Sequence, residues 1–174
     1  MTANSGSDGG GLIVDCRIEA GAWPDHLALE ALAEKTLLSA SSNASLRAAK
    51  RYVDGSEVSL LFTDDATIKA LNGQHRAKQT ATNVLSFPQK GPDAECFGPY
   101  LGDIVFAEET ISREAALENK PFMHHVQHLM VHGFLHLFGY DHIDDDDADE
   151  MEGLETTILQ TLGLADPYGD TVKP

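Results

Sequence analysis

The chain has 174 residues, of which 42% are hydrophobic, and its formal net charge is −16. This is the length of one ordinary domain with a single core. The negative charge argues against loose, sequence-independent binding to nucleic acid, because such binding comes mostly from cations that neutralise phosphates. No apolar run reaches the roughly 20 residues of a membrane span, so we expect a soluble protein with no membrane partner.

The two ends of the chain are predicted to be tails. The first eleven residues contain no apolar run and no basic side chain, and they do not resemble a signal peptide. We predict a disordered N-terminal tail over 1–11, a single domain over 12–165 and a C-terminal tail over 166–174. Cys16 and Cys96 form no CxxC pair and no disulfide framework, which is typical of a protein in the reducing cytoplasm.

Between the tails, hydrophobic periodicity and the punctuating Gly, Pro and Asp residues predict strands alternating with helices. The predicted strands are 12–18, 57–63, 84–87 and 101–106. The predicted helices are 23–40, 65–72, 108–117, a long one that starts at Pro121, and a last one that follows the Asp run 144–147. Residues 75–83, HRAKQTATN, are predicted to be a polar, basic loop.

Charge is distributed unevenly along the chain. Residues 47–90 carry seven Lys and Arg against four Asp and Glu, whereas residues 141–174 carry one against eleven. The middle of the chain is therefore basic and its end is acidic. Each cluster is equally well explained as solvated surface, so neither identifies a partner by itself.

The run HGFLHLFGYDH contains three histidines, His132, His136 and His142, at offsets 0, 4 and 10. His132 and His136 lie one turn apart on the same helix face, where two imidazoles can bind one metal ion. Gly139 can adopt positive φ and end the helix, which would bring His142 back to the same ion. Three nitrogen ligands leave one position of a tetrahedral zinc open, as a catalytic site requires. Zn²⁺ fits this donor set best, although Ni²⁺, Co²⁺ or Cu²⁺ can occupy the same nitrogens.

His128 is the alternative to His142 as third ligand, because it lies one turn before His132. The helix rises about 12 Å from His128 to His136, whereas zinc–nitrogen bonds are only about 2 Å long, so one helix cannot supply all three ligands. We therefore predict that His128 supports the ligands or packs beside them.

Two other metal-dependent classes share part of this pattern. The His spacing is also that of metzincin peptidases, but their general-base Glu after the first His is replaced here by Gly133. The Asp run 144–147 does not match a calcium loop, because a loop starting at Asp145 has Glu150 at the glycine position and one starting at Asp141 has Ile143 at a ligand position. It is better explained as a charged first turn of the last helix.

The segment HLMVHGFLHLFGYDH, residues 128–142, closely resembles the signature of the YbeY family of bacterial endoribonucleases and ribosomal RNA maturation factors. LNGQHRAKQTATNVLSFP, residues 71–88, and LGDIVF, residues 101–106, resemble that family's second and third motifs and occur in the same order. With the connecting segments, the resemblance covers roughly residues 50 to 160.

This resemblance implies a compact α/β (α+β) fold, in which a small mixed four-stranded sheet packs with about five helices. The metal site would lie at the end of the long His-bearing helix, in a cleft lined by basic residues. The resemblance places one Zn²⁺ on the same three histidines and assigns a functional role to Arg76. It also implies cleavage of single-stranded RNA, 3′-end maturation of small-subunit ribosomal RNA and ribosome quality control, with the small subunit and its associated proteins as partners.

On this hypothesis, the planar guanidinium of Arg76 clamps the phosphate and stabilises charge in the transition state. Asp141 is predicted to orient a ligand imidazole through its second nitrogen. Candidates for guiding the RNA backbone are Arg47, Lys50, Arg51 and Lys78. Two other functions stay open: a metallopeptidase or other metallohydrolase, which Gly133 disfavours, and a non-catalytic ribosome assembly factor with a structural metal.

Overall fold

The computed structural model describes residues 11–76 and 80–164. The strands are β1 (Leu12–Ile18), β2 (Ser56–Thr63), β3 (Val84–Pro88) and β4 (Tyr100–Ala107). The helices are α1 (His26–Ser41), α2 (Ala44–Ala49), α3 (Asp65–Arg76), α4 (Glu108–Leu117), α5 (Phe122–Leu137) and α6 (Asp145–Thr161). Among these, no helix is long and apolar enough to cross a lipid bilayer.

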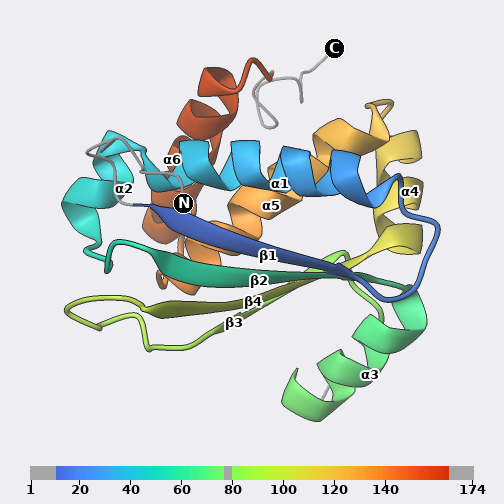
Figure 1. The fold of residues 1–174 in the computed structure, drawn as a ribbon, viewed down its shortest axis with the longest axis horizontal. Coiled ribbons are helices and arrows are strands. Elements are labelled where there is room, and N and C mark those ends of the chain that lie inside the picture. Colours follow the sequence, from blue (N-terminus) through green and yellow to red (C-terminus); the bar gives the residue numbers. More distant parts are fainter. Residues whose placement is uncertain (1–10, 77–79, 165–174) are drawn as a thin grey trace, which may run out of the picture.

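The four strands form one mixed sheet in the order β1-β2-β4-β3 (Figure 1). β1 pairs with β2 and β2 with β4 in parallel, and β3 pairs with β4 in antiparallel orientation at one edge. Each parallel pair requires a crossover connection. Helices α1 and α2 form the connection between β1 and β2, and α3 is the first part of the connection between β2 and β4. The fold class predicted from the sequence is confirmed.

Helices cover the two faces of the sheet unequally. α1 and α5 lie over one face with α6 behind them, whereas α3 lies on the other side near the ends of β2 and β4 (Figure 1). The large core sits under α1 and α5, where the stacked rings of Phe62 and Phe106 are 5.0 Å apart. A smaller cluster around Ile68 lies under α3. The long helix α5 therefore packs against the face of the sheet that carries the large core.

The structure adds one helix to the five that the sequence predicts. α2 has only six residues, too few to show helical periodicity, and its signal is the N-cap Asn43, whose side chain accepts a hydrogen bond from the backbone N–H of Leu46. α3 also continues one turn beyond the predicted end at residue 72, to Arg76. The predicted tails 1–11 and 166–174 lie, except for Gly11, outside the described residues.

Candidate metal centre

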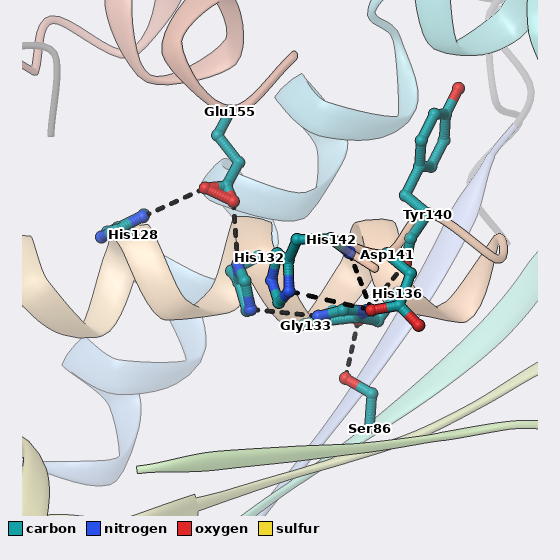
Figure 2. Close-up of polar contacts among 9 residues, drawn as sticks. All are labelled: Ser86, His128, His132, Gly133, His136, Tyr140, Asp141, His142 and Glu155. Carbon is teal, nitrogen blue, oxygen red and sulfur yellow. Dashed lines mark hydrogen bonds and ion pairs between the residues drawn. The ribbon is translucent and has the colours of Figure 1, made fainter. Parts of the chain in front are cut away.

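Two of the three predicted ligands, His132 and His136, lie one turn apart near the C-terminal end of α5. Their ring centroids are 4.6 Å apart and their Nε2 atoms are 3.0 Å apart. Figure 2 shows both rings facing the same space, with the ring of His142 beside them. The four-residue spacing thus places two imidazoles on one helix face, as the sequence predicts.

The turn after α5 brings in the third ring. Gly139 has a φ of 90°, and its N–H donates to the carbonyl of His136 at 3.0 Å, while the N–H of Tyr140 donates to that of Leu135 at 3.3 Å. These bonds satisfy the last carbonyls of the helix and reverse the chain. The His142 ring centroid then lies 5.2 Å from each of the other two. The predicted glycine turn is confirmed, and one nitrogen of each ring lies within 4.8 Å of the others.

The hydrogen bonds of the two helical rings show which nitrogens are available to a metal. His132 Nδ1 donates to Oε2 of Glu155 at 2.8 Å, and His136 Nδ1 donates to the backbone oxygen of Tyr140 at 2.7 Å. Because carbonyl and carboxylate oxygens only accept, both Nδ1 atoms carry the proton and both Nε2 atoms present lone pairs. Nitrogens on one tetrahedral zinc lie about 3.3 Å apart, for bonds of about 2.0 Å. The donor set therefore fits one divalent cation bound by three imidazoles.

Burial differs across the three rings. Removal from water lowers the pKa of His136 to about 4, and the neighbouring charge of His132 acts in the same direction. His136 is therefore a neutral imidazole at neutral pH, with its proton on Nδ1, and this is the form that binds a metal. His142, by contrast, keeps 43% of its side chain exposed. The centre is closed on its helix side and open to solvent on its loop side, as a catalytic site requires.

Gly133 has a packing role that explains the missing general base. A Cβ at this position would lie 2.7 Å from Cγ2 of Ile104 and 3.2 Å from Oγ of Ser86. Oγ of Ser86 also donates to the carbonyl oxygen of Gly133 at 2.9 Å (Figure 2). α5 approaches the sheet so closely here that no side chain fits. A carboxylate after the first His, on which a metzincin-type peptidase depends, cannot be accommodated.

A carboxylate that sequence reasoning missed supports the centre from α6. Glu155 is fully buried, and its oxygens contact Nδ1 of His132 at 2.8 Å and Nε2 of His128 at 3.3 Å. The signal was its register: Glu155 lies four residues after Met151 and four before Leu159, inside an apolar stripe. A charged residue on a buried helix face needs a partner.

The two residues predicted to support the ligands have different surroundings. His128 lies one turn before His132, and both rings contact the carboxylate of Glu155 (Figure 2). Oδ1 of Asp141 accepts from the backbone N–H of His142 at 2.8 Å and lies 3.7 Å from Nδ1 of that ring. The second distance is too long for a hydrogen bond. In the structure, the Asp141 carboxylate is therefore hydrogen bonded to the backbone of the turn and not to the His142 ring.

A cleft of about 400 Å³ opens beside His136. It is lined by Ser86 in the middle of β3, by Pro88 at the end of that strand, by the following loop 89–92 and by the turn 139–141. Cavities of this size hold small ligands or one nucleotide of a longer chain. A substrate in the cleft would contact His136, one of the three clustered histidines.

Three of the predicted RNA-guiding cations lie together next to this cleft. Arg47, Lys50 and Arg51 line a hollow of about 160 Å³ at the end of α2. Lys50 Nζ donates to the backbone oxygen of Pro92 at 3.4 Å and lies 5.3 Å from the ring centre of Tyr140, and both partners line the cleft. This basic patch, residues 47, 50 and 51, therefore adjoins the cleft wall. Lys78 and the side chain of Arg76 lie outside the described residues.

Comparison with known proteins gives a consistent result. The sequence profile of the family described as Endoribonuclease YbeY matches residues 22–163. A curated Endoribonuclease YbeY of Rhizobium meliloti (strain 1021) is 51% identical over 166 residues, covering 91% of this chain and 96% of the relative. One of Sinorhizobium medicae (strain WSM419) is 49% identical over 162 residues, with 91% and 96% covered. A solution structure of a Thermotoga maritima protein shares the fold at 20% identity and a TM-score of 0.54, covering 93% of this chain and all of that one.

Proposed function

Because the chain belongs to the endoribonuclease YbeY family, we propose that it is a zinc-dependent endoribonuclease that cleaves single-stranded RNA. The observation that carries the proposal is the convergence of three imidazoles on one solvent-open point beside a cleft of about 400 Å³. Closed structural zinc sites use four protein ligands, whereas hydrolytic sites use three. The relatives' names support the reaction class, and the three-histidine geometry supports assigning the reaction to this end of α5.

In this proposal, one set of residues binds the metal and another binds the substrate. His132, His136 and His142 would hold the ion, which when bound supplies Lewis acidity at the phosphoryl group and a more acidic water. The buried hydrogen bonds on Nδ1 of the two helical rings fix which nitrogen each presents. Arg76, at the C-terminal end of α3, would bind the scissile phosphate as a planar, permanently charged donor.

RNA would approach along the side of the molecule that carries the basic patch. The overall charge of −16 repels a polyanion, so contacts with phosphate must be local. Arg47, Lys50 and Arg51 provide three cations next to the cleft wall. We also propose Lys78 as an RNA-binding residue, because it lies in the basic segment 47–90 of the sequence. A local patch on an acidic protein favours one binding path over general adhesion to nucleic acid.

The proposed biological role is maturation of the 3′ end of small-subunit ribosomal RNA, together with ribosome quality control in the cytoplasm. Its support is the family membership and the resemblance of the three motifs. The small ribosomal subunit and its associated proteins are the corresponding partners. If the protein instead acts only in assembly, its association with small subunits will persist after zinc is removed and no RNA will be cleaved.

Cleavage of a labelled single-stranded RNA by identically purified variants tests this proposal. His136→Ala should lose both zinc and cleavage, while Arg76→Glu should retain zinc and lose cleavage. Arg17→Ala, an exposed cation at the C-terminal end of β1 on the opposite edge of the sheet, is the matched control and should behave as wild type. Cleavage by the identically purified His136→Ala variant at the wild-type rate would overturn the proposal.

A further inference from the structure

The further inference concerns Glu155, the buried carboxylate that α6 places between two histidines of α5. Its side chain is fully buried, and each of its oxygens contacts a different imidazole. Figure 2 shows the carboxylate reaching from α6 to His132 and His128. Removing a carboxylate from water is costly unless its oxygens are hydrogen bonded, so this arrangement must offer a compensating interaction.

We propose that Glu155 is a positioning residue for the metal centre, which fixes the tautomer and orientation of His132 so that Nε2 faces the ion. The 2.8 Å contact with Nδ1 leaves Nε2 as the only nitrogen of that ring able to bind a metal. A carboxylate behind a ligand imidazole also raises the electron density at the ligating nitrogen. Glu155 does not touch substrate and acts through His132.

His128 contacts the other oxygen of the Glu155 carboxylate. Its Nε2 lies 3.3 Å from Oε1 of Glu155, and its ring centroid is 6.4 Å from that of His132. By contacting the second oxygen, His128 restricts rotation of the carboxylate and keeps Oε2 aligned with His132. The effect of His128 on the metal therefore passes through Glu155.

The three ligands differ in how they are oriented. His136 Nδ1 donates to the backbone oxygen of Tyr140 at 2.7 Å, which no side-chain substitution removes. His142 is exposed, and its Nδ1 lies 3.7 Å from the nearest carboxylate of its own turn, that of Asp141. His132 is thus the ligand whose orientation depends on a distant side chain. This dependence makes the effect of Glu155 separable from the effect of the turn.

The inference rests on the proposed metal site but not on RNA cleavage, so the test measures metal binding. Zinc affinity is measured by competition with a chromophoric chelator for wild type, Glu155→Gln and Glu152→Gln, and Co²⁺ absorption spectra report ligand geometry. Glu155→Gln keeps the shape and removes the carboxylate, and we expect zinc affinity to fall about 10- to 100-fold with an altered Co²⁺ spectrum. Glu152→Gln makes the same chemical change at a partly exposed site on α6 and should bind zinc like wild type.

Two further variants test how the effect is transmitted. His128→Gln should lower zinc affinity less than Glu155→Gln, and it should have little further effect in the Glu155→Gln background, because both act through one contact. Circular dichroism and thermal unfolding of the metal-free variants establish that each is folded. Zinc should raise the melting temperature of wild type more than that of Glu155→Gln.

Several results would overturn the inference. Unchanged zinc affinity and an unchanged Co²⁺ spectrum in Glu155→Gln would show that the carboxylate only holds α6 in place, whatever happens to the melting temperature. Equal losses in Glu155→Gln and Glu152→Gln would show a general effect of lost negative charge. Failure of the wild-type protein to bind zinc would contradict the proposed function itself and is therefore distinguishable.

Discussion

The two halves of the candidate metal centre are built differently. His132 and His136 sit on a helix that is packed against the sheet, and hydrogen bonds hold both of their Nδ1 atoms. His142 sits on an exposed turn and reaches the same point because Gly139 allows the reversal. The helical half is fixed by burial and the loop half by one backbone conformation.

Because of this difference, substitutions of the helical histidines and of His142 should affect the stability of the fold unequally. A ligand on the buried helix cannot be changed without disturbing the core, because its neighbours include a buried carboxylate and the sheet. A ligand on the exposed turn can be changed at little cost to the fold. The same solvent exposure should make His142 dispensable for folding and leave the candidate metal centre accessible to substrate.

The largest expected contrast is between His132→Ala and His142→Ala. Both should lose stoichiometric zinc, but His132→Ala also takes a partner from buried Glu155 and should destabilise the metal-free protein by about 3 kcal/mol. His142→Ala should stay within about 0.5 kcal/mol of wild type, as expected for an exposed side chain. Urea unfolding in the presence of a chelator measures both values. Equal destabilisation by the two variants would contradict the proposed difference between the helical and the loop ligands.

A second contrast compares two helical glycines. Gly133→Ala places a methyl group 2.7 Å from Ile104 Cγ2 and should cost about 1–3 kcal/mol, with weaker zinc binding as α5 shifts. Gly153→Ala on α6 meets nothing within 4 Å and should gain up to about 1 kcal/mol through helix propensity. Opposite signs in thermal unfolding would support the close approach of α5 to the sheet. Stabilisation of both would disprove it.

The sequence predicts the metal centre better than the surface around it, for a physical reason. The distances within the His132–His142 run are set by helix geometry and by one glycine, so local sequence is sufficient. Glu155 comes from another helix, and only tertiary packing brings it to His132. Helix α2 was missed for a different reason, because its six residues carry one Asn cap and no periodic pattern. A long-range contact and a short helix therefore account for these two omissions.

A third contrast concerns the exposed cations. Arg51→Ala, in the basic patch, should weaken RNA binding several-fold and reduce the slope of log affinity against log salt by about 0.7, as expected when one contact with single-stranded phosphate is lost. Arg17→Ala at the opposite edge of the sheet should change neither. Binding measured across a salt series in the metal-free protein separates this effect from catalysis. Identical salt slopes for all three proteins would remove Arg51 from the RNA path.

The smallest expected effect is on the pH dependence of stability. Burial lowers the pKa of His125 below its usual value, although the Glu114 carboxylate acts in the opposite direction. The unfolded chain then binds the proton more readily, so this residue lowers stability as pH falls below about 6.5. His125→Gln should flatten that loss relative to His124→Gln, an exposed histidine on the same helix. Superimposable pH profiles of the two variants would contradict the prediction.

The most direct test of the central claim is a zinc titration of the metal-free protein, with cleavage of labelled single-stranded RNA measured at each step. We predict no cleavage without zinc, a linear rise, and a plateau at about one equivalent, because the three imidazoles form one site. Full cleavage by protein shown to contain no metal would contradict the assignment of these histidines to catalysis.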